Sequence, residues 1–120
     1  MLRNASLPKQ TTLKIDKDMH PSPALEMEYV HEAVALLEKR GLRVEQIQAT
    51  TTFHGVHYYI TISPPIDAST ANRLQYLLGD DSKRVDYNQA RIDSGLREWN
   101  KLFEALGRKL RTIYSRGATH

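Results

Sequence analysis

Two aspartates in this sequence have the type and spacing that metal-assisted phosphoryl-transfer sites use. Asp16 and Asp18 lie in the segment 11–18, where apolar and polar residues alternate as in a half-buried strand. Side chains two residues apart on a strand project to the same face, about 7 Å apart at the backbone. Two carboxylates at this spacing can hold divalent ions, and Mg or Mn is the expected metal. Aspartates are also common where a strand ends in solvent, so the spacing alone fits both interpretations.

A histidine from another expected strand faces the same way. His57 follows Gly55 and belongs to the alternating segment 56–62, in which Tyr59 and Thr61 share its face. A strand histidine at such a position either contacts a ligand or is solvated or bonded structurally. His54 lies three residues earlier and therefore faces the other side, which argues against a zinc pair with His57.

Hydrophobic periodicity predicts the elements that position these residues. Strands are expected over 11–18, 44–52 and 56–62, and helices over 24–40, 67–78, 83–92 and 96–114. The order β-α-β-β-α predicts an α+β domain with a small antiparallel or mixed sheet, ferredoxin- or RRM-like, and additional C-terminal helices.

The first helix must cover the apolar face of that sheet. A β-α-β crossover places the helix on one face, where the apolar strand residues should form the core. These residues are Leu13, Ile15, Val56, Tyr58, Ile60 and Ile62. Asp16, Asp18 and His57 are then expected to converge on the opposite, polar face.

Composition limits the class of protein. The 120 residues suit a single domain, expected over 11–116 after a flexible stretch at 1–10. The absence of cysteine excludes disulfides and thiolate zinc sites, and no apolar run reaches the length of a membrane span. With no signal-peptide pattern at the start, a cytoplasmic protein is expected.

The positive charge is concentrated in the last third of the chain. Residues 1–82 carry eight Lys and Arg against ten Asp and Glu, whereas residues 83–120 carry nine against four. Such a basic segment suits contact with a phosphate backbone, and Arg84, Arg108, Lys109 and Arg111 are the candidate nucleic-acid-binding residues. A solvated helix face would show the same charge.

Two segments resemble motifs of the archaeo-eukaryotic primase superfamily. Leu-Lys-Ile-Asp-Lys-Asp at 13–18 is similar to its hydrophobic-Asp-x-Asp motif, and Thr-Thr-Phe-His-Gly-Val-His-Tyr-Tyr-Ile at 51–60 is similar to its second motif. The segment 73–84, with Asp86 and Arg91 beyond it, resembles a stretch in small primase-like proteins of archaea and mobile elements. The resemblance implies that Asp16 and Asp18 bind divalent metal and that His57 contacts the phosphates of a nucleotide.

The sequence departs from that superfamily in its third acidic residue, which normally lies on a later strand. The candidates Asp67, Asp86 and Asp93 all fall in expected helices or helix starts. The leading hypothesis is therefore a primase-like, nucleic-acid-associated domain for DNA replication or processing, with its site at Asp16, Asp18 and His57. Without a third acidic residue, both an active nucleotidyltransferase and a catalytically degenerate domain fit the sequence. The alternatives are a non-enzymatic nucleic-acid binder and an interaction module whose last helix forms a homo-oligomer.

Overall fold

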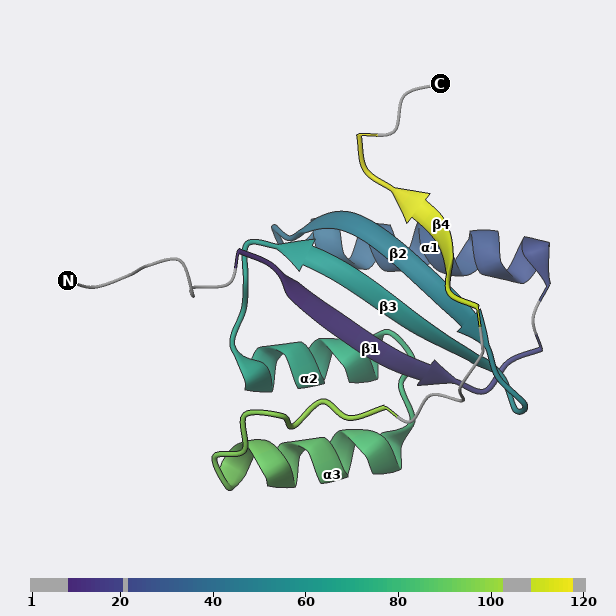
Figure 1. Ribbon diagram of the computed structural model, residues 1–120. Helices are drawn as coiled ribbons and strands as arrows, with labels where there is room; N and C mark the ends of the chain where they lie inside the picture. Colours follow the sequence, from purple (N-terminus) through teal and green to yellow (C-terminus); the bar gives the residue numbers. More distant parts are fainter. Residues whose placement is uncertain (1–8, 21, 103–108, 118–120) are drawn as a thin grey trace.

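The computed structural model describes residues 9–20, 22–102 and 109–117. The described residues form four strands and three helices (Figure 1): β1 (Thr11–Lys17), α1 (Pro23–Glu38), β2 (Arg43–Thr51), β3 (Val56–Ser63), α2 (Ala68–Leu77), α3 (Ser82–Asp93) and β4 (Arg111–Ser115). The α+β class is confirmed. The expected flexible stretch 1–10 lies, apart from residues 9 and 10, outside the described residues.

The strands form one antiparallel sheet in the order β1-β3-β2-β4. β2 and β3 are the predicted hairpin, and β1 pairs along the other side of β3, so that β3 and β2 occupy the centre. β2 also pairs with β4, and the register of this pair shifts between Ile47 and Gln48. β4 thus extends the sheet beyond β2, at the edge opposite β1.

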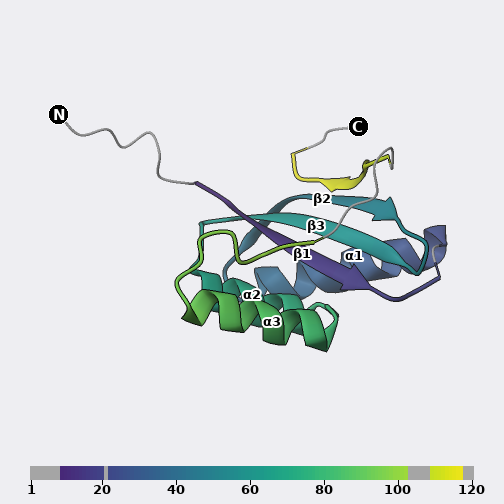
Figure 2. The ribbon, with the colours of Figure 1, turned by 60° about the horizontal axis from the view of Figure 1, so that its bottom comes forward.

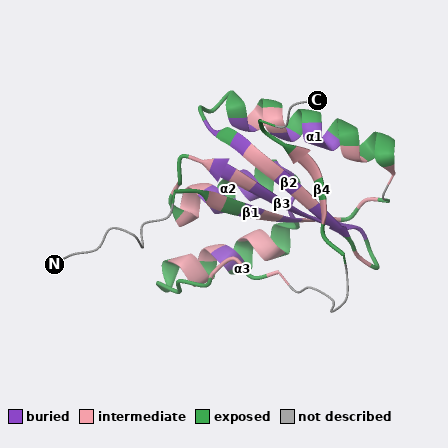
Figure 3. Cartoon of the chain, turned by 45° about the horizontal axis from the view of Figure 1, so that its top comes forward, coloured by how far each residue is buried: buried purple, intermediate pink, exposed green. Residues whose placement is uncertain are grey.

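The helices lie on one side of the sheet, as Figure 2 shows. The core between the two layers is formed by the predicted apolar strand face together with α1 and α2, and Figure 3 shows the buried residues concentrated in the central strands. The six strand residues expected in this core are all fully buried: Leu13, Ile15, Val56, Tyr58, Ile60 and Ile62. Strand alternation therefore predicted the apolar face correctly, whereas His57 and Tyr59 on the other face of β3 are buried as well.

The helix predicted over 96–114 is wrong for the residues that the structure describes. Leu96–Leu102 form neither helix nor strand, and Arg111–Ser115 form β4. Apolar residues at helical spacing suggested the helix, yet Thr112, Ile113 and Tyr114 are β-branched or aromatic and favour a strand. The open edge of β2 supplies a partner strand, and pairing in the sheet overrides the local pattern. Arg108 lies outside the described residues.

The other sheet edge, at β1, is closed by side chains from the α2–α3 region. The backbone N–H of Lys14 donates to Gln75 Oε1 (3.0 Å) and that of Asp16 to Asp80 Oδ1 (2.9 Å). Arg84 donates from Nη2 to the carbonyl of Lys14 (2.8 Å). Gln75 and Asp80 are buried, so these bonds satisfy an edge that would otherwise offer unpaired backbone groups to another strand.

We expect Arg84→Met to destabilise the fold by about 3–5 kcal/mol, because it leaves the Asp80 carboxylate buried without its cation. The Arg84 Nε–Asp80 Oδ1 distance is 3.1 Å, and the Asp80 side chain has no exposed surface. Urea unfolding measures the change. The exposed Arg73 on α2 provides the control, and Arg73→Met should stay within about 0.5 kcal/mol of the parent. Equal stabilities of the two variants would contradict the edge-closing role.

Two stacked tyrosines join α1 to β3 within the core. The rings of Tyr29 and Tyr58 lie 4.1 Å apart, centroid to centroid, at an angle of 17°. The Tyr29 hydroxyl donates to the carbonyl of Leu78 (2.9 Å), which ties α1 to the end of α2. Burial raises the pKa of Tyr58 to about 12, with Glu26 adding to the shift, and burial raises the pKa of Tyr29 as well.

These raised pKa values predict alkaline unfolding. The stabilisation that the two protonated tyrosines contribute is fully present below the unfolded-state tyrosine pKa of about 10. It is lost as the pH rises through the pKa values that the tyrosines have in the folded state. We expect the free energy of unfolding to fall steeply above pH ~10. Tyr29→Phe should flatten this fall, whereas Tyr76→Phe, at an exposed tyrosine, should follow the parent. Urea titrations across this pH range test it, and identical curves for the parent and Tyr29→Phe would refute the assignment.

Candidate functional site

Asp16 and His57 are brought together on the polar face of the sheet. They are register partners across β1 and β3, and His57 Nε2 lies 3.5 Å from Asp16 Oδ1. Directly opposed side chains in an antiparallel pair face the same way, which explains the contact. His57 is buried, whereas the Asp16 side chain is 39% exposed. His57 therefore lies behind the Asp16 carboxylate, and the exposed part of that carboxylate is accessible to a ligand.

Asp18 joins this site from a turn and not from the strand. β1 ends at Lys17, one residue before Asp18, and the N–H of Met19 donates back to the Lys17 carbonyl (3.1 Å). Asp18 is exposed, and it lines the same cavity as Asp16. The three residues predicted from the sequence thus lie in one region. Asp16 contacts His57 and lines the same cavity as Asp18.

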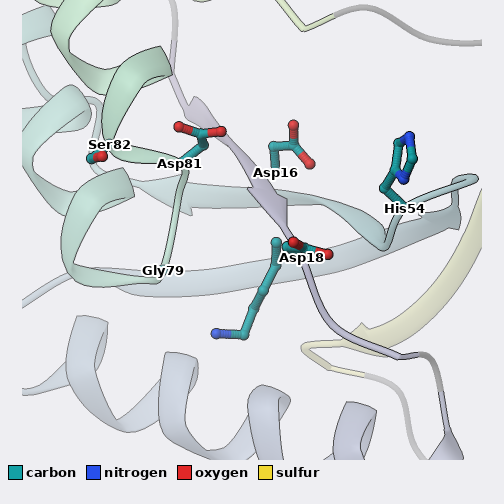
Figure 4. Close-up of a pocket in the computed structure, with 7 residues that line it drawn as sticks. Asp16, Asp18, His54, Gly79, Asp81 and Ser82 are labelled. Carbon is teal, nitrogen blue, oxygen red and sulfur yellow. The ribbon is translucent and has the colours of Figure 1, made fainter.

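The cavity has a volume of about 570 Å³ and lies where the end of β1 meets the start of α3 and the β2–β3 turn. Figure 4 shows Asp16, Asp18, Asp81 and His54 around it. The full lining consists of Asp16, Lys17, Asp18, His54, Gly79, Asp81 and Ser82. His57 is not part of this lining, and His54 takes the place that the sequence had suggested for it.

Asp81 is the most informative residue that sequence reasoning did not assign to the site. It caps α3, because its Oδ1 accepts from the N–H of Lys83 (2.8 Å). The same carboxylate also lines the cavity. Its neighbour Asp80 binds β1 and Arg84. No local pattern encodes this meeting of β1 with the start of α3.

The cavity carries an excess of negative charge. Asp16, Asp18 and Asp81 contribute three carboxylates, and Lys17 is the lysine in the lining. The Lys17 ammonium lies 5.6 Å from the centroid of the Tyr29 ring, in a cation–π contact on the side of α1. Because the carboxylates outnumber the cation, the cavity attracts cations.

The carboxylates alone do not make a closed metal site. Among the described residues, no group of three or more His, Cys, Asp or Glu side chains converges in a way that could hold a metal ion. Magnesium usually binds through one or two carboxylates, with substrate phosphates and water completing the octahedron. Asp16 and Asp18 match this arrangement only in the number of carboxylates that they contribute to the cavity.

Two of the predicted basic residues, Arg84 and Arg111, have structural partners. Arg84 binds Asp80, and Arg111 forms two hydrogen bonds with Glu26 of α1, of 3.0 and 2.7 Å, which raise the pKa of Arg111. Lys109 is exposed. Arg111 lies on a strand and Arg84 on a helix beyond the opposite sheet edge, so the described members do not form the single basic helix face that the sequence suggested.

Comparisons with known protein families, with curated proteins and with solved structures find no match for this chain. No helix within the described parts of the chain is long and apolar enough to cross a membrane.

The β2–β3 turn is held against the end of β1 by Gly55. A Cβ atom at this position would lie 2.2 Å from the Lys17 carbonyl oxygen and 3.0 Å from Asp18 Cα. The close approach keeps His54 beside the two aspartates, and only glycine permits it.

We expect Gly55→Ala to cost about 3 kcal/mol or more, because the methyl group must push the turn away from backbone atoms that cannot yield. Gly95→Ala is the matched control, since Gly95 has a positive φ of 81° but no atom within 4 Å of the added Cβ. That control should lose only about 1–2 kcal/mol of conformational strain. Denaturant unfolding of both variants makes the comparison, and a smaller loss for Gly55→Ala would show that the turn can move freely.

Proposed function

We propose that this chain is a primase-like, nucleic-acid-associated domain that binds nucleotide phosphates through a divalent cation at Asp16 and Asp18. One observation carries the proposal. Asp16 touches His57 across two strands and shares an acidic cavity with Asp18, next to the start of α3. The resemblance of these strands to primase motifs supports the same assignment.

Each residue has a distinct role in this proposal. Asp16 and Asp18 supply the oxygen ligands that Mg²⁺ or Mn²⁺ prefers, and the cation neutralises phosphate charge that the carboxylates would otherwise repel. His57 is buried behind Asp16, at 3.5 Å, and orients its carboxylate. Asp81 adds negative charge to the cavity from the start of α3.

The proposed activity is binding and not template-directed synthesis. A third carboxylate on a later strand would be needed to hold a pair of ions, yet the later strand β4 has the sequence Arg-Thr-Ile-Tyr-Ser. Asp67 caps α2, and Asp86 and Asp93 lie on α3. We therefore expect that the ion enters together with the nucleotide and is held weakly without it.

The alternatives receive less support. RNA-recognition domains stack bases on exposed aromatic residues of the sheet, but Tyr59, the aromatic candidate on the polar face, is only 8% exposed. An assembly module built on the last helix loses its basis, because the described part of that segment contains no helix.

Mn²⁺ binding to the purified chain tests the proposal. We expect weak binding alone, at least tenfold tighter binding with ATP present, and loss of binding in Asp16→Asn and Asp18→Asn, because the amide keeps the shape but removes the charge. Electron paramagnetic resonance of free Mn²⁺ measures all of these. Asp81→Asn keeps a good helix cap and isolates the effect of its charge.

Asp93→Asn, at the far end of α3, is the matched control and should bind as the parent does. Parent-like binding by Asp16→Asn, or absence of Mn²⁺ binding at millimolar concentration with ATP present, would refute the metal site.

A further inference from the structure

The tip of the β2–β3 turn presents an aromatic ring to solvent beside the acidic cavity. Phe53 is 85% exposed, more than any other large hydrophobic residue that the structure describes. Its neighbour His54 lines the cavity together with Asp16 and Asp18. The exposed ring therefore stands at the rim of the proposed phosphate site.

The turn holds Phe53 in place. The N–H of Thr52 donates to the Gly55 carbonyl (2.8 Å), and the N–H of Gly55 donates to Thr52 Oγ1 (2.9 Å). Gly55 itself is packed so closely on Lys17 and Asp18 that no side chain would fit. The two ends of the four-residue turn are thus bonded to each other, and its Gly55 end is packed on the end of β1.

The two aromatic rings at the tip are arranged edge to face. Their centroids lie 4.8 Å apart at an interplanar angle of 78°. An edge-to-face contact covers at most one face of the Phe53 ring, and the high exposure of Phe53 leaves ring surface available for a flat ligand.

We propose that Phe53, supported by His54, is a stacking platform for a nucleobase. This inference rests on the proposed function and names the part of the ligand that the cavity does not hold. Any nucleobase can stack on an aromatic face, whatever the nucleotide sequence. A protein partner, in contrast, requires an apolar patch around the aromatic residue that anchors it. Here the surroundings are the polar Thr52, His54 and Asp18, so the tip suits a base better than a protein surface.

Fluorescence of Phe53→Trp tests the platform directly. The chain has one native tryptophan, Trp99, so the signal of this variant minus that of the parent reports on the tip. Adenosine, ATP with Mn²⁺ and a short oligodeoxyadenylate at low salt should quench it saturably. Deoxyribose 5-phosphate, which has the phosphate but no base, should not.

Affinity measurements with Phe53→Ala give the second arm. Loss of one stacked base should weaken binding of the base-bearing ligands about 5- to 150-fold. Tyr87→Ala is the matched control, since Tyr87 is an exposed aromatic (64%) on α3, and it should bind as the parent does. A stronger effect of Phe53→Ala on ATP identifies a free nucleotide as the source of the base, and a stronger effect on the oligonucleotide identifies a single strand.

The outcomes separate the two proposals. Loss of Mn²⁺-dependent binding in Asp16→Asn with parent-like binding in Phe53→Ala overturns the platform and leaves the metal site standing. The reverse result overturns the metal site alone. Equal quenching by deoxyribose phosphate, or no binding of either ATP or the oligonucleotide by the parent, also overturns the platform.

Discussion

The buried carboxylate of Asp80 is the interaction on which both the fold and the site depend. Its Oδ1 accepts from the backbone N–H of Asp16 (2.9 Å), from the N–H of Asp81 (2.9 Å) and from Arg84 Nε (3.1 Å). Burying a charge costs several kcal/mol unless a partner charge and hydrogen bonds compensate, and Asp80 has both. Because one acceptor joins β1 to the start of α3, the closed sheet edge and the cavity beside it share one origin.

The same network brings in the irregular segment that follows α3. Arg84 also donates to the Asn100 side-chain oxygen (3.1 Å) and to the Lys101 carbonyl, and Asn100 exchanges hydrogen bonds with Gln75. A helix over this stretch would direct its backbone groups to itself. The Lys101 carbonyl instead accepts from Arg84, and the Asn100 side chain covers Gln75 and Arg84, which close β1. This gives a physical reason for the failure of the helical pattern there.

Local patterns predicted most of the fold but only part of the site. Alternation in β1 and β3 identified the buried face and placed Asp16 with His57, because both depend on the period of a strand. It could not place Asp18, since β1 ends at Lys17 and the following turn sets the direction of that side chain. Nor could it find Asp81, whose approach to β1 depends on the hydrogen bond between Asp16 and Asp80, 64 positions apart. His54 was missed because its position depends on the packing of Gly55 against the end of β1. The strand β4 was missed for the same reason, because its partner β2 lies far away in the sequence.

The three carboxylates that line the cavity come from different kinds of element, and this affects how the cavity can bind a metal ion. A site whose ligands all come from rigid strands can hold a metal ion by itself, whereas here Asp16 comes from a strand, Asp18 from a turn and Asp81 from a helix cap. The carboxylates repel one another, and Lys17 directs its charge toward Tyr29.

A cation relieves that repulsion, but with only two or three separated carboxylates its remaining ligands must come from water or phosphate. Affinity for the ion and affinity for the nucleotide should therefore be coupled, each raising the other by the same factor. In the proposed function the aromatic tip beside the cavity would contribute to both, because a base held on Phe53 would keep its phosphates near the aspartates.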